Sequence, residues 1–172
     1  MKRNVFLLFA VLLTLTFAGN ALAAGNNPQR IFKANVADAQ VVPLPALDTD
    51  LEATARITFD KGMRFVRIVV KISRNVSGVT DTHLHLGEAG TGDGLTDIVV
   101  TVKELFPPLF DGSFTILEVF LNTEIAAVGS VNNIVSLYDA MRKGRVYLDV
   151  HTVDMGGDFP NGEIRGQIFP AR

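Results

Sequence analysis

The sequence predicts an all-β domain: an antiparallel β-sandwich with Greek-key-like connections and one short helix near residues 133–143. Apolar and polar residues alternate with a period of two along most of the chain, as they do in half-buried strands. Stretches rich in glycine, aspartate and proline interrupt this alternation repeatedly. The chain has no cysteine, so its core and not disulfides must hold it together. A barrel is also compatible with the alternation, but a sandwich is favoured for a chain of this length with long connections.

The clearest pair of strands lies in residues 51–72. In "LEATARITFD" (51–60) every second residue is apolar, from Leu51 to Phe59. The following "DKG" is a turn signal, and "RFVRIVVKI" (64–72) then resumes the alternation. Strand, turn and strand predict a hairpin in which Ile57 and Ile68 point into the core.

The rest of the chain keeps the period of two, apart from one segment. Five further strands are expected in "THLHL" (82–86), "TDIVVTV" (96–102), "SFTILEVFL" (113–121), "GRVYLDVHTV" (144–153) and "GEIRGQIF" (162–169). Between them, "NNIVSLYDAMRKG" (132–144) has apolar residues at helical spacing. Asn133 or Ser136 can cap the start of this helix, and Gly144 fits its end.

The N-terminal segment has the three parts of a secretory signal peptide. A basic start and an apolar stretch precede Ala21-Leu22-Ala23, which is typical of a cleavage site. We expect residues 1–23 to be removed after Ala23, residues 24–30 to form a flexible leader, and residues 31–172 to form a single domain. The protein is then secreted or periplasmic; an uncleaved membrane anchor is disfavoured, because the apolar run is shorter than the roughly 20 residues of a span.

The charge of the mature chain argues against one class of partner. Lys2 and Arg3 are the only charged residues of the signal segment, so its removal leaves 14 basic and 18 acidic residues and a net charge of −4. A nucleic-acid-binding protein needs a basic face, so no nucleic acid is expected as a partner. No later segment is long and apolar enough for a membrane span.

Three sequence blocks resemble a known family. In order they are "THLHLGEAGTGDGLTDIVV" (82–100), "GRVYLDVHT" (144–152) and "FPNGEIRGQI" (159–168). Together they resemble the CHRD, or chordin-type, domain, and the chain resembles a bacterial, secreted, stand-alone copy of it over about residues 31–169. The resemblance implies an immunoglobulin-like β-sandwich without an established catalytic activity.

The later strands share a polar face, which has two interpretations. Alternation places His83 and His85 on one face of their strand, and Asp149 and His151 on one face of theirs. If the strands adjoin, this face also gathers further polar side chains, from Tyr147, Glu163, Arg165 and Gln167. One interpretation is a solvated sheet surface on which Glu163 or Asp149 pairs with Arg165. The other is a polar site for a metal or a ligand.

A metal site would depend on the chain's three histidines, His83, His85 and His151. Two imidazoles two residues apart leave the same face of a strand and can share one ion. His151 is the only candidate for a third, provided that its strand runs beside "THLHL". Glu163 or Asp149 could then be a fourth ligand or a partner of the histidines. Nitrogen ligands indicate copper or zinc.

These observations favour a secreted, non-catalytic CHRD-domain module that binds an extracytoplasmic protein or a small ligand, with no cofactor expected. The alternative is a protein that binds copper or zinc through His83, His85 and His151. No nucleophile motif is present, so an enzyme is not expected. A copper–zinc superoxide dismutase also has a β-sandwich and a His-x-His strand, but its two metals require more imidazoles than three.

Overall fold

The structure is a computed structural model that describes residues 30–37, 40, 51–73, 78–90, 97–104, 113–152 and 164–171. The expected signal peptide, residues 24–29 of the leader, and Glu163 lie outside the described residues. The regular elements are β1 (Ile31–Val36), β2 (Glu52–Phe59), β3 (Phe65–Ser73), β4 (Val79–Leu86), β5 (Ile98–Glu104), β6 (Phe114–Leu121), a 3₁₀ turn (Asn122–Glu124), α1 (Ile134–Arg142), β7 (Val146–Thr152), β8 (Ile164–Gln167) and β9 (Phe169–Pro170).

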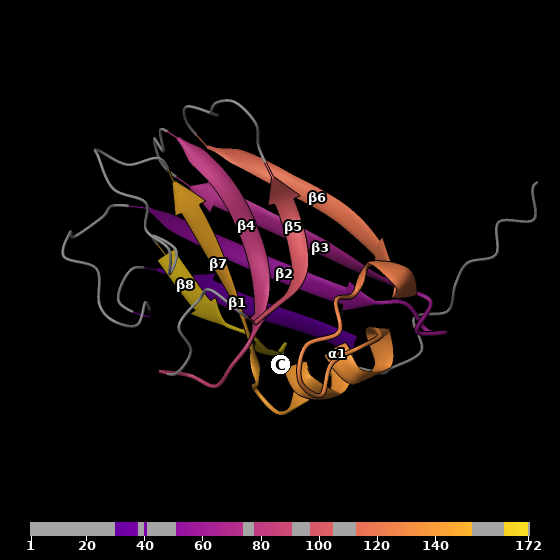
Figure 1. The fold of residues 1–172 in the computed structure, drawn as a ribbon. Coiled ribbons are helices and arrows are strands. Elements are labelled where there is room, and N and C mark those ends of the chain that lie inside the picture. The colour runs from indigo at the N-terminus through magenta and orange to yellow at the C-terminus, as the bar shows by residue number, and fades with distance from the viewer. Residues whose placement is uncertain are drawn as a thin grey trace, which may run out of the picture.

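The strands form two antiparallel sheets packed face to face (Figure 1), which confirms the predicted β-sandwich. One sheet has five strands in the order β6-β3-β2-β1-β9, and the other has four in the order β5-β4-β7-β8. The chain crosses between the sheets after β3, β5, β6 and β8, so both layers are built from segments distant in sequence. Strands β1 and β9 are not among those predicted above.

The core lies between the sheets and is filled by the apolar side of the alternation. In the predicted hairpin, β2 and β3 pair so that Ile57 lies directly opposite Ile68, and both side chains are fully buried. The second sheet contributes the other wall of the core through Leu84, Leu148 and Val150, which are also fully buried. Within the described residues, no helix has the length and apolar character of a membrane span.

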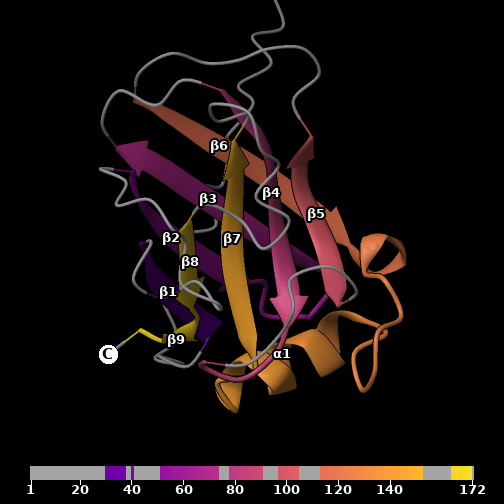
Figure 2. The ribbon, with the colours of Figure 1, turned by 60° about the vertical axis from the view of Figure 1, so that its left-hand side comes forward.

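Helix α1 closes one end of the sandwich (Figure 2). Asn133 caps its start, because its side chain accepts a hydrogen bond of 2.8 Å from the Ser136 backbone N–H. Gly144 follows the helix with φ of +66°, a conformation that glycine adopts without strain. Tyr138 packs edge-to-face against Phe32 and Phe59, which ties the helix to β1 and β2. The helix predicted near residues 133–143 is confirmed.

The two sheets are joined along one side by β1 and β8. Ala37, just after β1, exchanges two backbone hydrogen bonds of 3.0 Å with Arg165 on β8. At Gly166 the two backbones come so close that an added Cβ would collide with the Asn35 carbonyl oxygen and lie 2.8 Å from Val36 Cγ2. This close approach therefore requires a glycine in β8.

Replacing Gly166 by Ala is expected to lower the free energy of unfolding by about 1–3 kcal/mol, because the clash is with backbone and cannot relax by a side-chain rotation. Urea denaturation measures the change. Gly62→Ala is the matched control, since the added methyl there meets the flexible Arg64 side chain at 3.2 Å. Equal stability of the Gly166 and Gly62 variants would contradict the junction described here.

Candidate metal centre

Strands β4 and β7 lie side by side, which is the condition for bringing the three histidines together. Their antiparallel register places His83 opposite Asp149, and Asp81 opposite His151. Because opposed residues point to the same side of a sheet, His83, His85, Asp149 and His151 share the outer face of the four-stranded sheet. The condition for His151 to join the other two histidines, that "VYLDVHTV" runs beside "THLHL", is therefore met.

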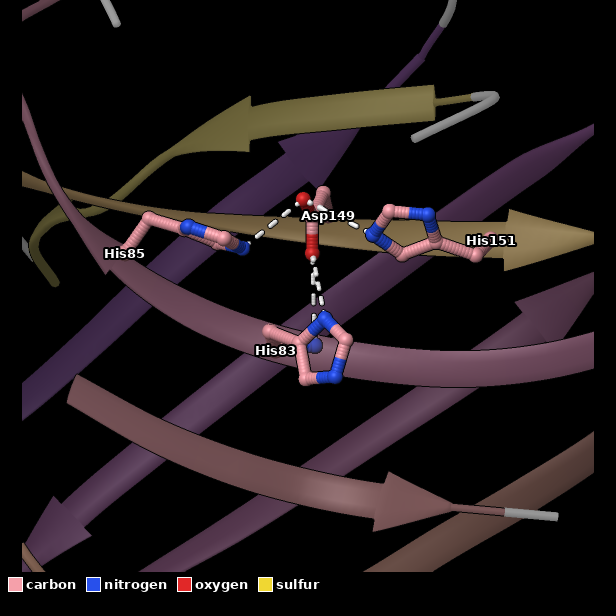
Figure 3. A group of neighbouring side chains, drawn as sticks. All are labelled: His83, His85, Asp149 and His151. Atoms are coloured by element: carbon pink, nitrogen blue, oxygen red, sulfur yellow. Dashed lines mark hydrogen bonds and ion pairs between the residues drawn. The ribbon is translucent and has the colours of Figure 1, made fainter. Parts of the chain in front are cut away.

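The four side chains converge on one point, with the Asp149 carboxylate between the three imidazole rings (Figure 3). Asp149 Oδ2 lies 2.9 Å from His85 Nε2 and 3.2 Å from His151 Nε2. Asp149 Oδ1 lies 3.8 Å from His83 Nδ1. One ligand atom from each residue lies within 4.8 Å of all the others. Asp149 is thus the fourth member of the group among the described residues, and the other candidate, Glu163, lies outside them.

This cluster is enclosed by the protein. His85 and Asp149 are fully buried, whereas the side chains of His83 and His151 keep 12% and 14% of their surface exposed. A solvated sheet surface is therefore the wrong interpretation of this face. The two partly exposed histidines mark the side on which the cluster reaches solvent.

The polar face is buried because other polar side chains on it fold back over the sheet. Arg165 stacks on Tyr147, with its guanidinium carbon 3.5 Å from the ring centroid, and donates a hydrogen bond of 3.1 Å to the Glu88 carbonyl. Gln167 donates to the Gly87 carbonyl at 3.0 Å, so β8 holds the segment that follows β4. Tyr147 in turn stacks on His85, with ring centroids 5.0 Å apart and planes 7° from parallel. These contacts fix the orientation of the His85 imidazole.

Asp149 remains ionised despite its burial. Burial alone raises the pKa of this carboxyl, but the close contacts with the His151 and His85 imidazoles outweigh it and hold the pKa at about 2. The His83 backbone N–H also donates to Asp149 Oδ1 at 3.3 Å. The centre of the cluster therefore carries a negative charge at neutral pH.

His83 is a neutral imidazole at the same pH. Burial lowers its pKa below the ordinary 6.5, and although Asp149 opposes this shift, His151 and His85 add to it. A neutral imidazole has a free nitrogen lone pair, and this is the form of histidine that binds a metal.

Several buried ring nitrogens lack a hydrogen-bond partner within the described part of the chain: His83 Nδ1, His85 Nδ1 and His85 Nε2. His85 Nε2 lies 2.9 Å from Asp149 Oδ2, but the angles of this contact are not those of a hydrogen bond. A buried polar atom without a partner costs about 1–3 kcal/mol, so such atoms call for an explanation. One ion among the four side chains would give a partner to His83 Nδ1 and to one of the two His85 nitrogens.

The spacing of the ligand atoms suits a single ion. Two ligands of a tetrahedral ion at about 2.0–2.1 Å lie about 3.3 Å from each other. The measured contacts with Asp149, 2.9, 3.2 and 3.8 Å, bracket that value. The ligand atoms lie within 4.8 Å of one another, so the widest pair would have to close by up to about 1.5 Å for all four to bind one tetrahedral ion.

The metal-free protein is expected to lose stability in two steps as the pH falls. His83 has a lower pKa folded than unfolded, so its contribution is present above pH 6.5 and is lost as the pH falls toward the folded pKa. Asp149 also has a depressed pKa, so its contribution of about 2 kcal/mol is present above pH 3.8 and is lost between pH 3.8 and about 2.

Urea denaturation of chelator-treated protein between pH 8 and pH 3 checks this prediction. In His83→Gln the first step should disappear, while the decline below pH 3.8 should remain. A stability that rises on acidification through pH 6.5 would contradict the assigned protonation states.

Comparison with known proteins gives one match. The profile of the CHRD domain matches residues 32–168, nearly the whole chain and all of its strands up to β8 apart from the first residue of β1. No curated protein and no solved structure matched the chain. The cluster of His83, His85, Asp149 and His151 lies inside the matched region, on two of the three blocks that carry the resemblance noted in the sequence. The chain belongs to the CHRD domain family.

Proposed function

We propose that this protein is a secreted, non-catalytic CHRD-domain module that binds one copper or zinc ion through His83, His85, Asp149 and His151. The observation that carries the proposal is the convergence of three imidazoles on a buried carboxylate, with ring nitrogens that have no other partner in the described residues. Buried polar atoms are almost always paired, and a metal ion bound between these side chains would supply the missing partner.

The ligand set determines the class of ion. Three nitrogens and one carboxylate oxygen are a donor set for zinc or copper, whereas calcium and magnesium require oxygen ligands. The negative charge of Asp149 offsets part of the charge of a divalent ion in a buried site.

The enclosure of the cluster supports binding without catalysis. Structural zinc sites have four protein ligands, whereas catalytic sites have three and leave one position open to water or substrate. Four side chains of this chain can occupy all positions of a tetrahedral ion, and two of them are fully buried. The ion then stabilises the pairing of β4 with β7, because His83 and His85 lie on one strand and the other two ligands on its neighbour.

Secretion is part of the proposal and rests on the N-terminal sequence. Protein recovered from its own compartment is expected to start at Ala24, because cleavage follows Ala21-Leu22-Ala23. Intact-mass measurement checks this result. A mass that retains residues 1–23 would contradict the secreted, soluble form.

Calorimetric titration of the metal-free protein with zinc and with copper tests metal binding. We expect one ion per chain, bound more tightly than about 10 μM, and loss of binding in His85→Ala. Glu104→Gln is the matched control, because Glu104 is an exposed carboxylate at the end of the neighbouring strand β5 and lies outside the cluster. Binding that is weaker than this, or unchanged in His85→Ala, would refute the proposed function.

A further inference from the structure

The outer face of the five-stranded sheet carries most of the exposed apolar side chains of the described residues. Leu117, Val119 and Leu121 project outward from β6 and are 47–55% exposed. Phe169 on β9, at the opposite edge, is 54% exposed and pairs with Lys33, so it projects from the same face. Of the five large apolar residues that are exposed, only Val135 lies elsewhere. Both edges of this face are therefore apolar.

The middle of the same face is basic. Four exposed cations project from its strands: Lys33 on β1, Arg56 on β2, and Arg67 and Lys71 on β3. Glu52 is the one carboxylate that the described strands place beside them. The chain as a whole has a net charge of −2, so this face is opposite in sign to the chain.

The register of the strands sets two of these cations against each other. Lys33 and Arg56 are directly opposed across β1 and β2. Like charges in that position destabilise a sheet. An anionic partner that lies over both cations attracts each of them and so offsets their repulsion. The partner of this face therefore carries negative charge.

We propose that the outer face of the five-stranded sheet docks on the surface of an anionic phospholipid bilayer. The lipid phosphates pair with the four cations, and the half-exposed side chains of β6 and β9 enter the boundary between headgroups and acyl chains. An acidic polysaccharide pairs with the cations equally well, but it leaves the apolar edges in water. The combination of cations and apolar edges on one flat face thus favours a bilayer.

The position of this face agrees with the other features of the protein. It lies on the side of the sandwich opposite the outer face of the four-stranded sheet, where the histidine cluster is found (Figure 1). A domain docked on a bilayer in this way keeps the cluster turned toward solvent. The docking proposal does not depend on whether the cluster binds a metal.

Vesicle sedimentation tests the proposal, with protein from its own compartment and vesicles of phosphatidylcholine alone or mixed equally with phosphatidylglycerol. We expect binding to the anionic vesicles only, and weaker binding at higher salt. Removing two cations with Arg67→Gln/Lys71→Gln should lower the partition coefficient about 30-fold. Removing apolar contact with Leu117→Ser/Leu121→Ser should lower it about tenfold.

The matched controls lie on α1 and at its C-terminal cap, and they are prepared in the same processed form as the test variants. Arg142→Gln/Lys143→Gln removes the same charge and Val135→Ser a similar apolar surface from exposed positions away from the sheet, so both should bind like the parent protein. All the substituted side chains are exposed, and unchanged melting temperatures verify that the variants are folded. Lys33→Gln/Arg56→Gln repeats the charge test at an independent pair.

Several results would overturn the proposal. One is absence of binding to anionic vesicles. Another is an equal loss of vesicle binding in the control variants, which would show that only the net charge of the protein matters. Binding of heparin that Leu117→Ser/Leu121→Ser leaves unchanged, without vesicle binding, would assign the face to an acidic polysaccharide. A dimer in sedimentation velocity that the same variant dissociates would assign it to a second copy of the chain.

Discussion

Replacing Asp149 by Asn is expected to weaken zinc or copper binding by at least about 100-fold. Asn keeps the size of the side chain but removes the negative charge that stands between the three imidazoles. Changes to residues that only support metal ligands already cost about 10–100-fold in affinity, and Asp149 is both a proposed ligand and a contact of all three histidines. Calorimetric titration of the metal-free variant measures the loss.

The matched control for this substitution is again Glu104→Gln, which removes an exposed carboxylate from β5. It should leave the affinity within about twofold, because screened surface charges contribute little. If Asp149→Asn and Glu104→Gln bind the ion equally well, Asp149 is not a ligand and the carboxylate only fills space between the histidines.

Replacing Ile57 or Ile68 by Asp is expected to lower the free energy of unfolding by several kcal/mol, enough to unfold a domain of ordinary stability. Both side chains are fully buried, and they lie directly opposite each other in the hairpin of β2 and β3. A carboxylate there has no partner and must either remain charged in the core or take up a proton. Urea denaturation and circular dichroism measure the effect.

Thr58→Asp is the control for these core substitutions. Thr58 neighbours Ile57 on β2 but faces outward, and its cross-strand partner is Arg67, so the new charge gains a cation beside it. It should change stability by less than about 1 kcal/mol. An equally large loss in Thr58→Asp would mean that the two faces of β2 are assigned the wrong way round.

The strands and their faces could be predicted from the sequence because the alternation of apolar and polar residues shows which side chains point to each face of a sheet. Leu84 and Ile68 point into the core and His83 points out, as the period of two requires. Strand β1, "IFKANV", has the same alternation, but it is short and lies between connecting segments, and its pairing with β2 is a long-range contact. Strand β9, which pairs with β1, has only two residues, and these are too few to show an alternation.

The enclosure of the metal centre could not be predicted in the same way. Alternation shows that Asp149 and His85 leave the sheet on the polar side, but it does not show what lies over them. In the structure Arg165 and Gln167 bind the carbonyls of Glu88 and Gly87, while Tyr147 stacks on His85. These contacts join residues about 60 to 80 positions apart, and only the fold brings them together.

For the same reason, the sequence alone did not decide whether Glu163 or Asp149 joins the three histidines. Glu163 and Asp149 both lie on the polar side of their strands in the sequence pattern. The register of β4 with β7 sets His83 directly opposite Asp149, which places its carboxylate among the imidazoles. A shift of one residue in this register would turn Asp149 into the core and dissolve the group.

The central claim is that His83, His85, Asp149 and His151 hold one metal ion, and elemental analysis of the protein purified from its own compartment tests it most directly. The predicted result is one zinc or copper ion per chain, removed by a chelator and missing from His85→Ala, while Glu104→Gln keeps it. Protein that contains neither metal and takes up neither one more tightly than about 10 μM would contradict the claim.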